Sequence, residues 1–266
     1  MTDRYAVFGN PIAHSLSPKI HAFFAKDTGD ELSYEPILVP EGRFADTAHE
    51  FFCDGKGCNV TVPCKLDAYA FADVLTPYAE AAGAVNTLKK LEDGRIEGDN
   101  TDGRGLTADL KRLGVKLKGA KVLVMGAGGA ARGIIRPLQD ENTALITIVN
   151  RTIEKAKKLA EHFGVTACSY EGLSAEYDVI INATSTSLNG TLPPLADEIF
   201  RKAFFAYDLM YKPDGETVFT KKAFENGCTG VADGFGMLIM QAALSFELWR
   251  GVKPDVIKAI NYFRAC

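Results

Sequence analysis

The sequence predicts an α/β protein of two domains, an N-terminal α/β domain followed by a Rossmann-type domain. Two observations carry this prediction: strand and helix patterns alternate between residues 103 and 235, and one of these strands ends at a G-x-G-x-x-A turn. The length of 266 residues also exceeds the usual size of a single domain. We expect the domains to span 1–102 and 103–236, with helices in 237–266 completing the first domain.

The bulk composition is that of a globular protein. Hydrophobic residues make up 47% and charged residues 24% of the chain, which excludes wholesale disorder. A net charge of −4 without basic clusters argues against nucleic acid and anionic membranes as partners. No apolar run approaches the roughly 20 residues of a membrane span, and the N-terminus lacks the apolar core of a secretory signal. We therefore expect a cytoplasmic protein.

The cysteines are scattered along the chain, a pattern that favours free thiols over disulfides in a protein of this size. They are Cys53, Cys58, Cys64, Cys168, Cys228 and Cys266. Neither a C-x-x-C nor an H-E-x-x-H spacing occurs, so the sequence predicts no metal site.

The first hundred residues mix strands and helices. Residues 5–9 and residues 58–62 are predicted to form strands, because both are apolar runs that end at turn-forming residues. A helix between them is expected to open with Ser17 as N-cap and Pro18 at the first helical position, and to close at Gly29.

Residues 92–95 (EDGR) predict a hairpin with a two-residue turn. If Glu92 opposes Arg95, Asn86 faces Thr101 and Val85 faces Asp102. The polar side chains at 86 and 100–102 then gather at the open end of the hairpin. Alternatively, residues 100–102 form a capped turn before a helix that begins near residue 105.

Residues 103–235 are predicted to alternate between strands and helices, one of which is residues 153–163. Such a pattern predicts a parallel sheet with helices on both faces and a ligand beyond the carboxyl ends of the strands. Gly126, Asn150 and Asn182 would then share one edge. The expected strands are 121–125, 145–150, 178–182, 204–209 and 229–232, with a weaker candidate at 165–168.

The turn after the first of these strands predicts a dinucleotide site. Gly126 permits a tight turn, Gly128 lets the backbone approach a pyrophosphate, and Ala131 allows close packing of a helix whose N-terminus favours anions. The next strand ends at Asn150-Arg151-Thr152. An enzyme that uses NAD usually carries a carboxylate there, whereas an amide, a guanidinium and a hydroxyl suit a 2′-phosphate. The predicted cofactor is therefore NADP(H).

Other polar side chains occupy positions that suit either a substrate site or a structural role. Lys65 lies where a buried strand gives way to a helix, and it is either catalytic or an exposed lysine on a first helical turn. Strand-like alternation would turn the hydroxyls of Ser15 and Ser17 the same way, to hold a carboxylate, or one serine caps the helix. Gln241 interrupts the apolar helix predicted for 237–250, so its amide bonds either backbone or a ligand.

Together these motifs resemble the shikimate dehydrogenase family over nearly the whole chain. They occur in the family's order and are specific as a set. They are Tyr5–Pro18 (YAVFGNPIAHSLSP), Asn59–Lys65 (NVTVPCK), Ala84–Thr87 (AVNT), Gly98–Gly103 (GDNTDG), Gly126–Ala131 (GAGGAA), Asn150–Thr152 (NRT), Asn182–Ser185 (NATS) and Asp233–Met237 (DGFGM).

The resemblance implies a substrate domain and an NADP-binding Rossmann domain with a deep cleft between them. It implies reversible, NADPH-dependent reduction of 3-dehydroshikimate to shikimate in aromatic amino acid biosynthesis, by a monomer or homodimer. By matching position, Lys65 and Asp102 become the catalytic pair, in which the Lys65 ammonium donates a proton or stabilises the developing alkoxide. The substrate would contact Ser15, Ser17, Thr61, Asn86, Tyr211 and Gln241. The cofactor would contact Gly126, Ala127, Gly128, Gly129, Ala130, Asn150, Arg151, Thr152, Lys155, Thr184, Leu209 and Gly234.

The chain departs from the family pattern at four places that bear on the site. Lys155 replaces a second arginine of some relatives, the loop from Tyr211 to Thr217 has one residue more than usual, and the other two are Cys64 and Ser187. Cys64 stands beside Lys65, where relatives often carry an aromatic, histidine or aliphatic residue. Ser187 stands where a glycine is usual. If the backbone there needs a positive φ, the serine is strained by about 1–3 kcal/mol, or else the loop has shifted.

Two other functions fit the same motifs. One is a quinate/shikimate dehydrogenase of broader specificity, and the other is a non-catalytic sensor of the pathway's ligands. The presence of both Lys65 and Asp102 argues against the sensor.

Overall fold

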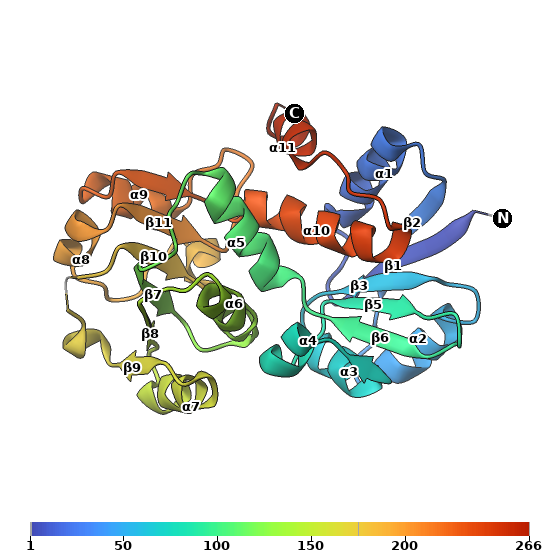
Figure 1. Ribbon diagram of the computed structural model, residues 1–266, viewed down its shortest axis with the longest axis horizontal. Helices are drawn as coiled ribbons and strands as arrows, with labels where there is room; N and C mark the ends of the chain where they lie inside the picture. The colour runs from blue at the N-terminus through green and yellow to red at the C-terminus, as the bar shows by residue number, and fades with distance from the viewer. Residues whose placement is uncertain (1, 175, 266) are drawn as a thin grey trace. The chain divides into compact units, whose positions relative to one another are not determined.

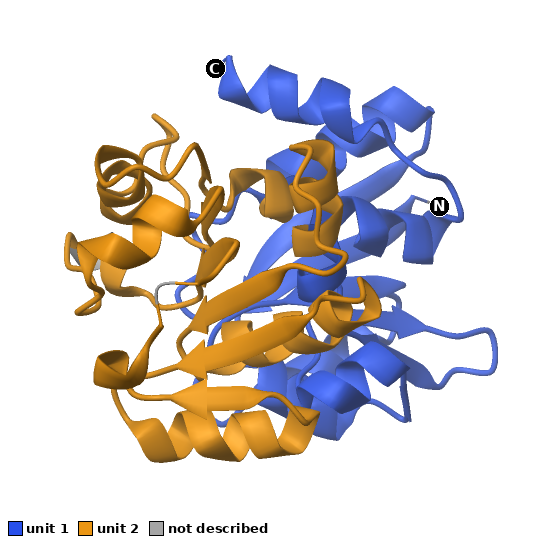
Figure 2. Ribbon diagram, turned by 60° about the vertical axis from the view of Figure 1, so that its left-hand side comes forward, with its two compact units in different colours: residues 1–105, 239–266 blue, residues 106–238 orange. Residues whose placement is uncertain are grey.

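The computed structural model describes residues 2–174 and 176–265. They form two compact units, coloured separately in Figure 2: unit 1 spans residues 1–105 and 239–266, and unit 2 spans 106–238. The chain leaves unit 1 within helix α5 (Asp102–Arg112) and returns to it within helix α10 (Phe235–Arg250). Each unit has its own sheet (Figure 1).

Unit 1 is built on a mixed sheet with the strand order β2-β1-β3-β5-β6-β4. Strand β1 pairs in parallel with β2 and β3, whereas β5 runs antiparallel to β3 and β6. The strands are β1 (Asp3–Gly9), β2 (Leu32–Leu38), β3 (Gly57–Val60), β4 (Val74–Leu75), β5 (Thr87–Lys90) and β6 (Ile96–Asp99). The remaining helices of this unit are α1 (Ser17–Thr28), α2 (Phe44–Phe51), α3 (Lys65–Phe71), α4 (Pro77–Ala82) and α11 (Val256–Arg264).

Both faces of the unit 1 sheet are covered. Helices α2, α3 and α4 bury one face, where Phe8 of β1 packs edge-on against Phe44 and Phe51 of α2. On the other face, Trp249 of α10 stacks on Tyr5 and donates a hydrogen bond to the carbonyl of Leu88 at 3.0 Å. The last turns of α10 are thereby held against the strands that precede the site.

Unit 2 is a doubly wound parallel sheet with the strand order β12-β11-β10-β7-β8-β9, and this order confirms the predicted Rossmann domain. All six predicted strands form, with ends within one residue of those expected. They are β7 (Lys121–Met125), β8 (Leu145–Val149), β9 (Thr166–Cys168), β10 (Val179–Asn182), β11 (Phe205–Asp208) and β12 (Gly230–Ala232). The helices are α6 (Gly129–Asp140), α7 (Ile153–Phe163), α8 (Asp197–Lys202) and α9 (Val218–Glu225), with 3-10 turns η1 (Tyr170–Gly172) and η2 (Thr186–Asn189).

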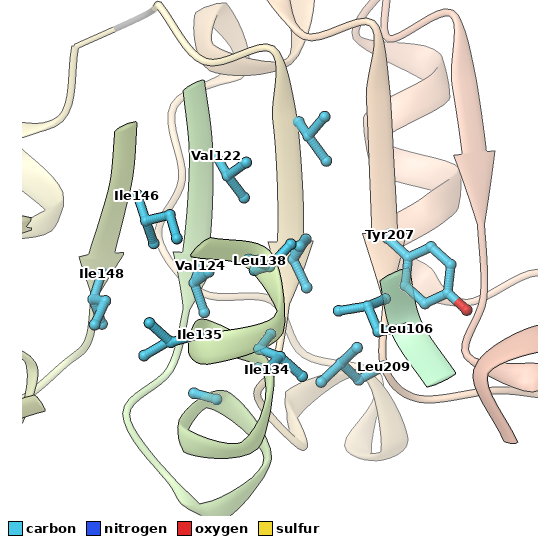
Figure 3. Packing of buried hydrophobic residues seen from close by; sticks show 14 of the residues in the cluster. Leu106, Val122, Val124, Ile134, Ile135, Leu138, Ile146, Ile148, Tyr207 and Leu209 are labelled. Atoms are coloured by element: carbon cyan, nitrogen blue, oxygen red, sulfur yellow. The ribbon is translucent and has the colours of Figure 1, made fainter. Parts of the chain in front are cut away.

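Alternation along the unit 2 strands divides the core into two layers. Val122 and Val124 of β7 pack against Ile134 and Leu138 of α6, as Figure 3 shows. The intervening residue, Leu123, belongs to the opposite layer, which α8 and α9 cover. Since each fully buried aliphatic side chain contributes about 1.5–3 kcal/mol, these layers hold the carboxyl ends of the strands in place.

The predicted hairpin forms, but its predicted pairing is wrong by one residue. Thr87 faces Asp99, so Asn86 does not face Thr101. The loop has three residues rather than two: Leu91 N–H donates to the carbonyl of Arg95 at 2.8 Å, and Gly94 adopts a φ of +88°. A three-residue loop with glycine in the left-handed region shifts the pairing by one position.

The start of α1 also differs from the prediction. Ser17 is the first helical residue, and Leu16 is the N-cap without a side-chain hydrogen bond. Residues 13 and 14 form a turn, closed by a hydrogen bond from the Ser15 N–H to the carbonyl of Ile12 at 3.0 Å, and residue 16 forms a bend, so the strand-like alternation expected through Ser15 and Ser17 is wrong. Instead, Ser15 Oγ accepts a hydrogen bond from the Ser17 N–H at 3.2 Å. The end of α1 is as predicted, since Gly29 closes it with a φ of 75°.

Candidate active site

Lys65 and Asp102 form an ion pair in unit 1. Each is the first residue of its helix, α3 and α5 respectively, so Asp102 begins the helix that was expected near residue 105. Their side-chain nitrogen and Oδ2 lie 2.5 Å apart, and the side chains are only 24% and 13% exposed. Lys65 does lie on a first helical turn, but its ammonium is held by a carboxylate rather than by solvent alone. Partial burial strengthens this attraction relative to that of a surface pair.

The backbone around the pair fixes both residues. Val85 N–H donates to the carbonyl of Lys65 at 3.0 Å, which ties the start of α3 to the chain entering the hairpin. Asn100 Oδ1 accepts the N–H of Asp102 at 3.2 Å, which caps the start of α5. The side chain of Cys64, the residue before Lys65, is buried in the core below α2 and α3.

Asn86 joins the pair from the end of the hairpin. Its Oδ1 accepts the backbone N–H of Thr101 at 2.9 Å, which determines the orientation of the amide. Its Nδ2 therefore donates to Asp102 Oδ1 at 2.8 Å, and it also lies 3.4 Å from Gln241 Oε1 of α10. Four of the predicted site residues, Lys65, Asp102, Asn86 and Gln241, thus come together from separate parts of unit 1.

Ser15, Ser17 and Thr61 follow the carboxyl ends of two adjacent parallel strands, β1 and β3. Ser17 is buried at the start of α1, whereas Ser15 and Thr61 are half-buried. The two loops meet at Gly9, where an added Cβ would lie 2.6 Å from Thr61 Cγ2. Hydroxyls grouped at a strand edge beside a helix N-terminus suit a carboxylate.

Below these residues lies a buried polar cluster centred on Asn59 of β3. Asn59 Nδ2 donates to Ser245 Oγ at 2.9 Å and to the backbone carbonyl of Asn86 at 3.3 Å. Its Oδ1 lies 3.1 Å from Nε2 of His21, which is fully buried in α1. The sequence pattern did not single out His21 or Ser245, because only the fold reveals that they are buried together.

His21 makes stability depend on pH. Burial lowers its pKa from 6.5 to about 3. Below about pH 6.5 the His21 side chain is protonated in the unfolded chain, whereas in the folded protein it stays neutral down to about pH 3. Protonation therefore favours the unfolded chain, and the free energy of unfolding falls as the pH falls through this range. Relative to His21→Phe, we expect the wild-type unfolding free energy to fall by about 1.4 kcal/mol per pH unit in this window.

Denaturant unfolding between pH 7 and pH 5 measures this difference in slope. His14→Gln is the matched control, because His14 is exposed and close to the same helix. Parallel pH profiles for the wild type and His21→Phe would contradict the prediction.

The glycine turn of unit 2 has the geometry that a pyrophosphate requires. Gly126 adopts a φ of +107°, and an added Cβ would lie 3.1 Å from the carbonyl oxygen of Ala183. Gly128 is the N-cap of α6, and an added Cβ there, or at Gly129, would meet no atom within 4 Å. Open space in front of the N–H groups of a helix N-terminus fits a phosphate.

A hollow of about 560 Å³ continues from this turn. Among the described residues that line it, Arg151 and Lys155 are cationic and none is acidic. Asn150 Nδ2 donates to the carbonyl of Thr152 at 2.9 Å and shapes the bend that presents Arg151. This positive charge fits a 2′-phosphate. The other lining residues are Ala127, Gly128, Tyr170, Thr184, Ser185, Thr186, Thr191, Leu192, Pro193 and Pro194.

Leu209 and Gly234 meet beyond the ends of β11 and β12. An added Cβ at Gly234 would lie 2.2 Å from the carbonyl oxygen of Leu209, so only glycine allows this approach. Tyr211 lies in the same unit with its ring against Phe235, whereas the other predicted substrate residues belong to unit 1.

Ser187 is not strained. It lies in the turn η2, and Asn142 is the only described non-glycine residue with a positive φ. The Ser187 hydroxyl is buried, donates to Asp208 Oδ2 at 2.6 Å and accepts from Asn182 Nδ2 at 3.1 Å. The backbone at Ser187 needs no positive φ, so the condition for strain is not met, and the serine hydroxyl links Asp208 to Asn182.

Other expected sites can be compared with the described residues. Cys53, Cys58, Cys64, Cys168 and Cys228 are free, and Cys266 lies outside the described part of the chain. Within residues 2–174 and 176–265 no cluster of three or more histidine, cysteine or acidic side chains could hold a metal ion. In the same ranges, every helix is too short or too polar to traverse a bilayer.

Three family models match successive parts of the chain. They are described as the shikimate dehydrogenase substrate binding domain (residues 7–88), shikimate/quinate 5-dehydrogenase (residues 109–191) and the shikimate 5′-dehydrogenase C-terminal domain (residues 234–259). The first falls on unit 1, the second on unit 2, and the third on the segment where the chain returns from unit 2 to unit 1.

Curated proteins and solved structures agree with these models. The chain is 52% identical to shikimate dehydrogenase (NADP(+)) of Vibrio campbellii, over 98% of this chain and 96% of that protein. It is 48% identical to the same enzyme of Cellvibrio japonicus, over 99% and 98%. Shikimate 5-dehydrogenase of Thermus thermophilus, solved with NADP(H) and shikimate, superposes with a TM-score of 0.92 at 38% identity over 99% of both chains. The chain belongs to the shikimate dehydrogenase family of NADP-dependent oxidoreductases.

Proposed function

We propose that this protein reduces 3-dehydroshikimate to shikimate with NADPH, reversibly, and that unit 1 binds the substrate while unit 2 binds the cofactor. The observation that carries the proposal is the half-buried Lys65–Asp102 pair with Asn86 hydrogen-bonded to it. A positioned ammonium can supply the proton that carbonyl reduction requires. The relatives named shikimate dehydrogenase (NADP(+)) support the choice of substrate and cofactor.

In the proposed mechanism, bound NADPH supplies the hydride that adds to the ring carbonyl carbon. The Lys65 ammonium donates its proton to the carbonyl oxygen, which becomes the hydroxyl of shikimate. Asp102 holds the ammonium in place and stabilises its charge before the transfer. With 24% of its side chain exposed, Lys65 can recover a proton from water. In the oxidation direction, the neutral amine of Lys65 accepts the proton of the hydroxyl.

Ser15 and Ser17 are proposed to bind the substrate carboxylate, and Thr61 and Gln241 to complete the unit 1 part of the pocket. Ser15→Ala and Ser17→Ala should each raise the KM for shikimate by about three- to tenfold, the value of one hydrogen bond, and leave kcat nearly unchanged. Steady-state kinetics with saturating NADP measure this. Ser33→Ala, an exposed serine on β2, is the control. An unchanged KM in both variants would refute the assignment.

The proposal is tested by following NADPH absorbance with 3-dehydroshikimate, and then with 3-dehydroquinate and with NADH. Turnover of 3-dehydroshikimate with NADPH supports the proposed function. Comparable turnover of both ketones would favour the broader quinate/shikimate activity, for which one matching family model is named. Ligand binding without turnover would identify a sensor.

We also propose that the enzyme acts in the cytoplasm, where NADPH is regenerated, as a monomer or homodimer. Sedimentation velocity at micromolar concentration distinguishes the two assemblies.

A further inference from the structure

Tyr34 connects two parts of the unit 1 site that are distant in sequence. It lies on the edge strand β2, and its ring stacks on His21 with the centroids 4.3 Å apart. Its hydroxyl donates to Asn59 Oδ1 at 2.7 Å, and it lies beside the side chain of Ser17. One phenol thus touches both the serine at the start of α1 and the centre of the buried polar cluster.

The direction of these hydrogen bonds follows from the orientation of Asn59. Its Nδ2 faces the backbone carbonyl of Asn86, which can only accept, so Oδ1 must face Tyr34 and His21. Both partners therefore donate to Oδ1. His21 is accordingly a neutral imidazole with its proton on Nε2, in agreement with its strongly lowered pKa.

The hydrogen bonds continue from Asn59 to the ion pair. Asn59 Nδ2 lies 3.2 Å from Thr87 Oγ1, and the Thr87 hydroxyl donates to Asn86 Oδ1 at 2.9 Å. Asn86 in turn donates to Asp102, the partner of Lys65. An unbroken series of hydrogen bonds therefore joins Tyr34, which lies beside Ser17, to the Lys65–Asp102 pair through uncharged side chains.

We propose that Tyr34 is a positioning residue that couples binding of the substrate carboxylate at Ser17 to the orientation of Asn59, and through it of Asn86. The inference rests on the proposed function, because it takes Ser17 to be a carboxylate ligand. Tyr34 lies between Ser17 and Asn59, and Asn59 is linked to Asn86. The separation of Ser17 and Asn86 must match the distance between the carboxylate and the reacting end of the substrate. Misplacement of such groups weakens binding even when the contact residues themselves are intact.

Tyr34 serves this role as a neutral donor. Burial raises the pKa of its phenol well above the usual value, so the hydroxyl keeps its proton throughout the working pH range of such an enzyme. The coupling is therefore expected to be independent of pH, and its loss should not alter the pH profile of kcat.

Tyr34→Phe removes only the hydroxyl and keeps the ring on His21. Calorimetric titration should show the Kd for shikimate raised about three- to tenfold, with the Kd for NADP unchanged. Tyr5→Phe is the matched control, since it removes the phenol hydroxyl of a second tyrosine of the same sheet, which is hydrogen-bonded to Arg250 rather than to this cluster. It should change the Kd for shikimate by less than about twofold.

A double-mutant cycle with Ser17→Ala distinguishes positioning from a general loss of stability. If Tyr34 acts through Ser17, Tyr34→Phe should change the Kd for shikimate by less than about twofold in the Ser17→Ala background. If the two substitutions raise the Kd for shikimate independently, so that their fold-changes multiply in the double variant, the inference is overturned. An unchanged Kd for shikimate in Tyr34→Phe alone would also overturn it. Wild-type protein that binds no shikimate would overturn the proposed function and this inference with it.

Discussion

Lys65→Ala is expected to lower kcat by about 10²–10⁴ in both directions, while the protein remains folded and binds NADP normally. This range is the usual contribution of a positioned acid–base group. The effect is large because Asp102 and Asn86 orient the ammonium, so the alanine variant loses both the proton and its placement.

The matched control is Lys253→Ala, which removes an exposed lysine from the same unit. Single-turnover kinetics with NADPH and 3-dehydroshikimate measure the chemical step directly, and circular dichroism checks folding. Near-normal kcat in folded Lys65→Ala would remove Lys65 from the chemistry.

Arg151→Ala should weaken NADPH binding by about 1.5–3 kcal/mol, the value of hydrogen bonds to a charged group, and leave NADH binding nearly unchanged. No acidic residue is among the described residues that line the hollow beside Arg151. Arg151 and Lys155 are therefore expected to bind the 2′-phosphate. Fluorescence titration with both nicotinamides measures the two affinities.

Arg136→Ala is the control, because Arg136 is an exposed arginine of unit 2 whose partner is Asp140. It should affect neither cofactor. Equal losses of NADH and NADPH affinity in Arg151→Ala would show that the arginine does not bind the 2′-phosphate.

The Rossmann unit could be predicted from sequence because its signals are local. The turn at Gly126 and the polar end of β8 at Asn150 each lie within a few consecutive residues, and parallel strands bring both to one edge. The same locality made the end of α1 at Gly29 predictable. The resemblance to the family added the residue roles that no local pattern contains.

Other features depended on geometry that the sequence pattern does not contain. The hairpin pairing was missed because a three-residue loop ending at Gly94 and a two-residue turn look alike in sequence. Strand β2 was missed because Pro36 interrupts it, which an edge strand tolerates. Tyr34 was missed with it. The burial of His21 and the inward hydroxyl of Ser187 followed only from the packed fold.

Isotope transfer tests the central claim, direct hydride delivery from NADPH to the ring carbonyl carbon. The wild-type protein would be incubated with 3-dehydroshikimate and NADPH that carries deuterium at both C4 positions, and the product examined by mass spectrometry and NMR. The account predicts shikimate with a single deuterium, on the carbon that bears the new hydroxyl. Unlabelled shikimate, or no reduction of the ketone, would contradict it.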